Sequence, residues 1–214
     1  MPNNVSFWDA FYKNNNDKIP NYDLWLGKYK NLLDLSKNET IIDLGCGSGG
    51  NTLYLKNNGY NVIACDFSKE ALNLVDKFIP NVKTLNVDIT KKLPFITEST
   101  MIVIADLSLH YFDVIKTEEI LGEIFRVLKK GGYLICRVNS INDINYGALD
   151  GIEIEKNYYA TIDGYKRFFD LEDIQKFFKK YAIDYCEESS VDKYGVVKKA
   201  WEIVAHKYRQ FFVM

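Results

Sequence analysis

The chain has 214 residues, 27 of them basic and 29 acidic, so its formal net charge is 27 − 29 = −2. This balance is unlike that of a dedicated nucleic-acid-binding protein, which usually presents a strongly basic surface. There are only two histidines, and the four cysteines are widely spaced with no Cys-x-x-Cys pair, which argues against a zinc cluster or a disulfide scaffold. We therefore expect any demanding chemistry to come from an organic cofactor, with no metal.

The start of the chain and its apolar runs bear on location. The first ten residues have neither the basic region nor the apolar stretch of a signal peptide. No apolar run approaches the roughly 18–20 residues that a bilayer-spanning helix needs. These features, together with cysteines that we expect to be reduced, predict a cytoplasmic protein with no membrane partner.

Short apolar segments alternate with amphipathic helical segments over residues 39–138. Strands are expected at 40–44, 61–65, 82–87, 100–105 and 133–138, and helices at 51–58, 68–79 and about 116–130. Continuous apolar strands that alternate with helices are typical of a parallel sheet covered on both faces. A helix at about 171–180 and strand-like runs at 182–186 and 200–206 follow. We predict an α/β, Rossmann-like fold with a seven-stranded, mostly parallel sheet and a C-terminal antiparallel hairpin.

The length suits one domain, which we divide into three parts. Residues 1–38 form an expected helical cap whose aromatic residues can cover the mouth of a pocket. Residues 39–138 form the cofactor-binding half. Residues 139–214 hold an insertion of roughly thirty residues on the substrate side, the last helix and the terminal strands. A loop of that length is often functional. The aromatic residues of the cap are Trp8, Phe11, Tyr12, Tyr22 and Trp25.

A glycine-rich segment, DLGCGSGG at 43–50, joins the first expected strand to a helix. Glycines let the backbone turn tightly and approach a ligand without interference from a Cβ atom. Asp66 ends the second expected strand, where a carboxylate can accept hydrogen bonds from both hydroxyls of a ribose. The loop alone is ambiguous, because it fits both the GxGxxG pattern of dinucleotide-binding proteins and a DxGxGxG pattern.

Five segments in order resolve this ambiguity by resemblance. They are the glycine loop at 43–49, VIACDFS around Asp66, NVDIT around Asp88, ADLSLHYF at 105–112 and RVLKKGGYLI at 126–135. Over essentially its whole length the sequence resembles class I S-adenosylmethionine-dependent methyltransferases. The stretch GGNTLYLKNNGYNVIACDFS is similar to small bacterial methyltransferases of the tellurite-resistance and thiopurine type, whose acceptors are soft chalcogen nucleophiles.

The resemblance implies S-adenosylmethionine as cofactor and S-adenosylhomocysteine as product. It implies that Asp66 binds the ribose and that Asp88 reads the adenine amino group, while the negative charge of Asp43 favours a cationic sulfonium ligand over a pyrophosphate. The implied cofactor-binding residues are Asp43, Gly45, Cys46, Gly47, Gly49, Asp66, Phe67, Asp88, Ile89 and Asp106.

The segment after the fourth strand borders both cofactor and acceptor in this family. Methyl transfer is an in-line displacement, which needs a general base only if the nucleophile carries a proton that must be lost. His110 or Asp106 can serve as that base, whereas His206 lies in an expected terminal strand and is expected to be structural. Candidates for the acceptor pocket are Tyr111, Arg137, Tyr159 and Arg167, with Tyr146, Tyr158 and Phe168 in the same stretch of chain.

The acceptor is expected to be a small molecule. The segment at 105–112 lacks the Asn/Asp-Pro-Pro-Tyr pattern of amino-methylating nucleic-acid enzymes, and the paired glutamates of protein arginine methyltransferases are missing. A non-catalytic S-adenosylmethionine-binding sensor or partner protein is the main alternative. A nicotinamide-dependent dehydrogenase would usually need a Tyr-x-x-x-Lys pair, and Tyr194 with Lys198 falls between the last two strands instead of on a helix. A macromolecule methyltransferase would need a basic or extended groove.

Overall fold

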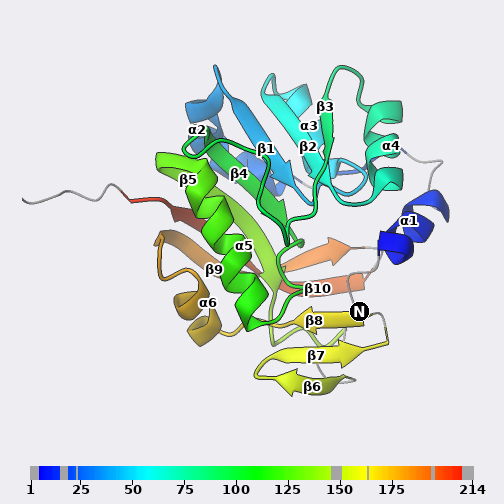
Figure 1. The fold of residues 1–214 in the computed structure, drawn as a ribbon, viewed down its shortest axis with the longest axis vertical. Helices are drawn as coiled ribbons and strands as arrows, with labels where there is room; N and C mark the ends of the chain where they lie inside the picture. Colours follow the sequence, from blue (N-terminus) through cyan, green and yellow to red (C-terminus); the bar gives the residue numbers. More distant parts are fainter. Residues whose placement is uncertain are drawn as a thin grey trace, which may run out of the picture.

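The computed structural model describes residues 5–14, 19–22, 24–145, 151–162, 164–193 and 196–208. Its centre is a seven-stranded sheet in the order β3-β2-β1-β4-β5-β10-β9 (Figure 1). Strands β1 to β5 are parallel, and β10 runs antiparallel to both β5 and β9. The predicted fold is thereby confirmed. The strands are β1 (Thr40–Leu44), β2 (Asn61–Asp66), β3 (Lys83–Asn86), β4 (Thr100–Asp106), β5 (Leu128–Asn139), β9 (Ala182–Lys193) and β10 (Val196–His206).

Helical segments cover both faces of this sheet. Successive strand residues point to opposite faces, and Ile41 and Ile42 of β1 accordingly belong to different core clusters. The cluster of Ile42 includes α5 and α6, and the cluster of Ile41 includes η1, α2 and α3. The helical segments are α1 (Val5–Asn14), η1 (Trp25–Tyr29), α2 (Lys30–Leu33), η2 (Asp34–Ser36), α3 (Gly50–Asn57), α4 (Lys69–Phe78), α5 (Val114–Val127) and α6 (Leu171–Phe177). No described helix is long and apolar enough to cross a membrane.

The end of α5 differs from the expected one. The helix ends at Val127, whereas the sequence predicted an end near residue 130. Leu128, the first residue of β5, is extended and fully buried, and it pairs with Thr100 of β4. Lys129 forms an ion pair with Glu39 at 2.7 Å. Strand pairing and burial therefore override the local helix signal.

The expected insertion contains a small antiparallel sheet. Its strands are β6 (Ile152–Glu155), β7 (Tyr158–Thr161) and β8 (Gly164–Arg167), in the order β6-β7-β8. Figure 1 shows this sheet beyond the carboxyl-terminal ends of the parallel strands. The backbone N–H of Arg167 donates to His110 O at 2.7 Å, and that of Phe169 donates to Asn139 O at 2.8 Å. These bonds attach the end of β8 to the main sheet at the carboxyl-terminal ends of β4 and β5, an edge called the site edge below.

Helix α1 lies against the loops at the same edge. Asp9 accepts hydrogen bonds from the Ser68 hydroxyl and from the Glu70 backbone N–H at the start of α4. The Trp8 and Tyr111 rings meet edge to face with centroids 5.8 Å apart. The helix thus contacts the loop after β2 and the segment after β4. Of the other aromatic residues expected on helices, Trp25 lies on the 3-10 helix η1 and Tyr22 lies outside the helices.

Candidate functional site

The glycine loop lies between β1 and α3 and has three residues in left-handed conformations. The φ angles are 74° at Gly45, 55° at Gly47 and 94° at Gly49, a region that glycine adopts without strain. A Cβ atom on Gly45 would overlap Ser108, and one on Gly47 would lie 2.6 Å from the hydroxyl oxygen of Tyr12. The loop is therefore packed closely between the segment after β4 and α1.

Replacing Gly45 with alanine is expected to lower the free energy of unfolding by about 2–4 kcal/mol, because it adds a steric overlap to an unfavourable φ. Gly59 provides the matched control, since its φ is 81° and nothing lies within 4 Å of an added Cβ. Gly59→Ala is expected to cost only about 1 kcal/mol, from strain alone. Urea unfolding of both variants measures the difference, and equal losses would contradict crowding at Gly45.

Asp43 at the end of β1 is almost completely buried, with 1% of its surface exposed. Its Oδ2 accepts a hydrogen bond from Thr52 Oγ1 at 2.6 Å, while Oδ1 is buried without a partner. Burial raises the pKa of Asp43 to about 7, and the negative charges of Asp106 and Asp66 act in the same direction. A cationic or hydrogen-donating group placed beside Oδ1 would therefore be stabilised.

Asp66 joins the loops that follow β1 and β2. Its Oδ2 accepts from the backbone N–H of Gly47 and its Oδ1 from that of Ser68, both at 2.9 Å. The side chain is buried, and burial raises its pKa even though these hydrogen bonds favour the charged form. Each carboxylate oxygen can accept more than one hydrogen bond, so hydroxyl groups of a ligand can still bind there.

Asp88 follows β3 and is exposed. Its Oδ1 accepts hydrogen bonds from the Thr90 backbone N–H at 2.9 Å and from Thr90 Oγ1 at 2.6 Å. Ile89 is half-buried and packs against the core, and Phe67 is tied to β3 through a hydrogen bond from the Asn86 amide to its carbonyl oxygen. The predicted cofactor-binding residues thus lie at the carboxyl-terminal ends of β1, β2 and β4 and on the loops after β1, β2 and β3.

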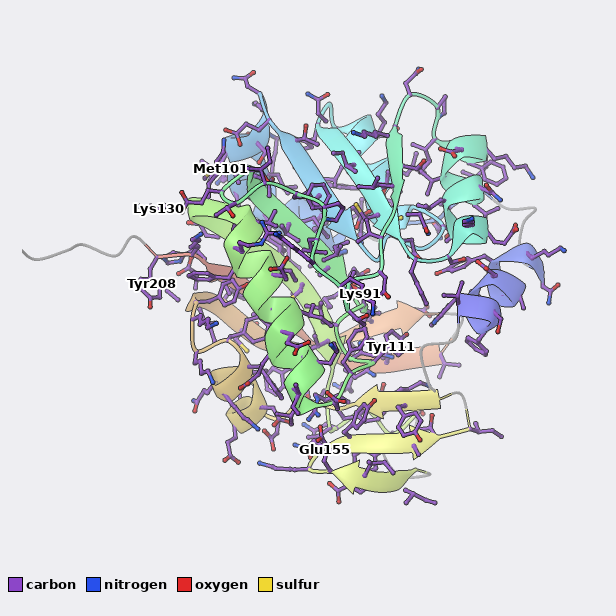
Figure 2. The ribbon with its side chains drawn as sticks, in the orientation of Figure 1. Lys91, Met101, Tyr111, Lys130, Glu155 and Tyr208 are labelled. Carbon is purple, nitrogen blue, oxygen red and sulfur yellow. The ribbon has the colours of Figure 1, made fainter. Side chains whose placement is uncertain are left out.

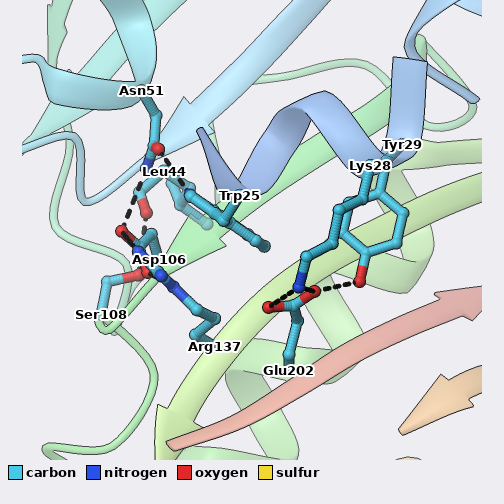
Figure 3. A network of polar contacts seen from close by, with 9 residues as sticks. All are labelled: Trp25, Lys28, Tyr29, Leu44, Asn51, Asp106, Ser108, Arg137 and Glu202. Carbon is cyan, nitrogen blue, oxygen red and sulfur yellow. Dashed lines mark hydrogen bonds and ion pairs between the residues drawn. The ribbon is translucent and has the colours of Figure 1, made fainter. Parts of the chain in front are cut away.

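A buried ion pair connects the ends of β4 and β5 (Figure 3). Arg137 Nε donates to Asp106 Oδ1 at 2.7 Å and Nη2 donates to Oδ2 at 2.9 Å, an arrangement that follows from the pairing of these two residues in the sheet. Trp25 stacks on the guanidinium group at 4.4 Å. Asn51 connects the ion pair to Trp25. It donates to Asp106 Oδ2 at 3.3 Å and accepts from Trp25 Nε1 at 2.9 Å.

Asn51 and Trp25 were not among the predicted site residues. Trp25 was expected only as a cap residue, and Asn51 only as part of a helix. No local pattern identifies their partners, because Asn51 is 26 positions from Trp25 and 55 from Asp106. One sequence feature could have indicated a role for Asn51 in the site, namely its position in the first turn of the helix that follows the glycine loop.

His110 lies in the segment after β4 and is 1% exposed. Its Nδ1 is buried without a hydrogen-bond partner. Burial holds the pKa of His110 well below its usual value, and the positive charges of Lys198 and Lys166 lower it further. Its ring lies 4.4 Å from that of Tyr111, which Figure 2 shows between the parallel strands and the small sheet.

The remaining predicted acceptor residues lie on the small sheet. Arg167 is fully buried, and its guanidinium group donates to Phe112 O, Lys156 O and the Glu155 carboxylate, so it holds β8 in place. Tyr159 is half-buried on β7 with its ring 5.9 Å from that of Phe168. Tyr158 donates to Tyr111 O at 3.3 Å. Tyr146 and Tyr194 lie outside the described residues.

A cavity of about 240 Å³ adjoins the ion pair. Arg137 and Trp25 border it on one side, and residues 189–192 of β9 border it on another. Glu202 on its wall binds the ammonium group of Lys28 at 3.0 Å and the hydroxyl of Tyr29 (Figure 3). In the described part of the chain, no group of three or more His, Cys, Asp or Glu residues is placed to hold a metal ion.

Comparison with known families gives a match, and the matched residues include both the glycine loop and the carboxylates at the strand ends. Residues 42–136, somewhat under half of the chain, match the family model described as a methyltransferase domain. This part of the chain is therefore similar to methyltransferase domains. The match begins within β1 and ends within β5, so the matched segment includes Asp43, Asp66 and Asp106.

Individual relatives are also named methyltransferases. The chain is 31% identical over 100 residues to an uncharacterized methyltransferase of Synechocystis, covering 47% of each protein. It is 25% identical over 193 residues to a tRNA N(3)-methylcytidine methyltransferase of Drosophila melanogaster, covering 78% of this chain and 57% of that protein. The chain thus spans about half the length of these two curated relatives.

A solved structure extends the likeness in fold beyond the matched domain. It is the 1,6-didemethyltoxoflavin-N1-methyltransferase of Burkholderia thailandensis, which holds 1,6-didemethyltoxoflavin and S-adenosylhomocysteine. The TM-score is 0.67 at 16% identity, and the match covers 96% of this chain and 87% of that one. The likeness in fold therefore includes the segments that flank residues 42–136.

Proposed function

We propose that this protein transfers a methyl group from S-adenosylmethionine to a small-molecule acceptor. The observation that carries the proposal is the buried Asp43, which has an unpartnered carboxylate oxygen beside a glycine loop that Asp66 ties to β2. Dinucleotide pyrophosphate would bring negative charge to this carboxylate, whereas the amino group of S-adenosylmethionine brings positive charge. The family of the domain supports the same cofactor.

Each predicted cofactor residue has a place in this proposal. The amino-acid portion of the cofactor lies along Gly45, Cys46, Gly47 and Gly49, with Asp43 beside its ammonium group. Asp66 accepts hydrogen bonds from the ribose hydroxyls. Asp88 accepts from the adenine amino group, and Ile89 and Phe67 provide apolar contact to the adenine ring. When bound, S-adenosylmethionine supplies a methyl group already activated by its sulfonium charge.

We assign the two catalytic candidates different roles. Arg137 donates to both oxygens of Asp106, so Asp106 orients the site and accepts hydrogen bonds. His110 remains neutral at physiological pH because its pKa is lowered. We propose that its unpartnered Nδ1 accepts the proton of an acceptor whose nucleophilic atom carries one.

The size of the acceptor is inferred from the cover over the site. Helix α1 places Tyr12 against Gly47 and Trp8 against Tyr111, and these contacts over the site favour a compact acceptor over a nucleic-acid strand. The net charge of −2 is also unfavourable for binding a polyanion. The likeness to a tRNA-modifying enzyme of Drosophila makes transfer RNA the informative counter-example in any test.

The decisive experiment has two stages. Calorimetry first compares binding of S-adenosylhomocysteine with that of NADH, and only the former is expected to bind. Release of S-adenosylhomocysteine is then measured with pools of phenols, carboxylic acids, amines, thiols, thiopurines and tellurite, with unmodified transfer RNA as a separate arm. Turnover of transfer RNA alone would overturn the small-molecule proposal, and tight binding without any turnover would favour a sensor.

Binding of S-adenosylhomocysteine is expected to weaken as pH falls. With a pKa of about 7, Asp43 is mostly protonated in the free protein at pH 6, and the ammonium group of the ligand favours its ionised form. Binding therefore releases a proton, and Kd is expected to rise about tenfold for each pH unit well below 7. Calorimetry from pH 5.5 to 8 measures this slope. Asp43→Asn is expected to remove it, and an equal slope in that variant would contradict the assignment.

A further inference from the structure

Partnerless buried polar atoms gather at the site edge of the sheet. Among the described residues, five of the seven with such atoms lie there, including His110, Asn139 and Ser189. Asn139 is fully buried, and neither its amide nitrogen nor its amide oxygen has a partner. An unsatisfied buried polar group costs about 1–3 kcal/mol, and such groups are expected where a ligand supplies the missing partner.

Strand register places two of these groups on one surface. Ala200 of β10 pairs with Asn139 of β5 on one side and with Ser189 of β9 on the other. Paired residues project from the same face of a sheet, so the Asn139 and Ser189 side chains stand on either side of the small Ala200 side chain. Ser189 also borders the 240 Å³ cavity.

Lys198 adds a positive charge to this surface. It lies two residues from Ala200 on β10 and therefore on the same face, and it is 8% exposed. A lysine buried to this extent is uncommon. Its charge also reaches His110, as the lowered pKa of the imidazole shows. Figure 1 shows the end of the β9–β10 hairpin at the edge of the sheet where β4 ends.

We propose that Asn139, Ser189 and Lys198, here called the Lys198 patch, bind a carboxylate group of the methyl acceptor, which is therefore a small organic acid. This inference rests on the proposed methyl transfer and names its substrate class. Lys198 supplies the charge, and the Ser189 hydroxyl and the Asn139 amide supply hydrogen-bond donors. Because the Asn139 amide and the Ser189 hydroxyl have no partners, binding breaks no existing hydrogen bond of these side chains.

The position of the patch also defines how the acid is oriented. The carboxylate would bind on β10, and the rest of the molecule would extend toward His110 and the ring of Tyr111. An aromatic acid suits this path, because its ring can pack against Tyr111. The nucleophilic atom would then lie on the His110 side, away from the carboxylate.

The two histidines of the chain allow a test that does not depend on turnover. With S-adenosylhomocysteine saturating, benzoate is titrated at constant ionic strength while the imidazole C–H resonances are followed by NMR. Benzoate is expected to shift the His110 resonance, and the neutral isostere benzamide is expected to bind about tenfold more weakly. His206 pairs with Asp184 at 2.8 Å on the far part of β10 and serves as the internal reference.

Lys199 provides the matched control, because it is the adjacent lysine on the opposite face of β10. Lys198→Gln is expected to weaken benzoate binding about tenfold, and Lys199→Gln less than about twofold. Lys198→Arg, which keeps the charge, is expected to restore most of the loss. Ser189→Ala removes a hydroxyl without a partner and is expected to weaken binding about threefold, so the proposal stays testable if Lys198→Gln does not fold.

The outcomes separate the two proposals. If S-adenosylhomocysteine does not bind, the proposed methyl transfer fails before benzoate is added. If it binds and benzoate leaves the His110 resonance unmoved, or benzamide binds equally well, the carboxylate site is overturned. Equal effects of Lys198→Gln and Lys199→Gln would also overturn it, because Lys198 belongs to the patch and Lys199 lies on the opposite face of β10.

Discussion

Replacing Arg137 with methionine is expected to lower the free energy of unfolding by about 3–5 kcal/mol. The Arg137 and Asp106 side chains are only 3% and 7% exposed, so the variant leaves a buried carboxylate with much weaker compensation. Asn51 still donates to that carboxylate, but at 3.3 Å. The loss also removes the stacking of the guanidinium group on Trp25. Urea unfolding followed by circular dichroism measures the change.

Two further variants distinguish a buried charge from general disruption. Adding Asp106→Asn to Arg137→Met removes the uncompensated charge and is expected to recover about half of the lost stability. Lys179→Met breaks an exposed ion pair with Glu118 and is expected to change stability by less than about 1 kcal/mol. If Arg137→Met lost no more than Lys179→Met, the ion pair would not have the role that its burial implies.

Replacing Asp66 with asparagine is expected to weaken binding of S-adenosylhomocysteine about 100-fold. Two ribose hydroxyls that donate to a carboxylate contribute about 1.4 kcal/mol each, and each such contribution corresponds to tenfold in Kd. The amide keeps one acceptor oxygen, but it loses the negative charge and the symmetry of the two acceptors. Calorimetry at pH 8, where Asp43 is largely ionised, measures the change without interference from that group.

Asp76 offers the matched control, since it is an exposed aspartate on α4 that contacts Thr84. Asp76→Asn is expected to leave Kd unchanged within about twofold. A thermal melt of each protein shows whether Asp66→Asn also loosens the loops that it joins. Binding by Asp66→Asn within about threefold of the parent would exclude Asp66 as the ribose ligand.

The fold was predictable wherever the signal was local. The glycines after β1 and the Ser68 cap of α4, whose hydroxyl accepts from Ala71 N–H at 3.2 Å, specify where strands end and helices begin. The end of α5 was not predictable in this way, because Leu128 is held extended by its pairing with Thr100. The small sheet β6–β8 was expected only as an irregular insertion, since its strands are four residues long.

The candidate site was predictable residue by residue but not as a set of contacts. Asp106 and Arg137 were both chosen from the sequence, one as a base and the other as an acceptor ligand, yet they bind each other. Arg167 was expected to face the acceptor, and its donors instead hold β8 to the segment after β4. These outcomes depend on which strands are neighbours, and the spacing of residues along the chain does not contain that information.

The two hydrogen bonds that Asp66 accepts from Gly47 and Ser68 restrict how this protein can change during evolution. The carboxylate proposed to recognise the ribose also fixes the shape of both loops at the mouth of the site. A lineage that replaced it to accept a phosphorylated ribose would have to rebuild the two turns at the same time. The Lys198 patch, proposed for the acceptor, lies on β5, β9 and β10 and outside these two turns, so new acceptors can be acquired there while the nucleoside preference is inherited unchanged.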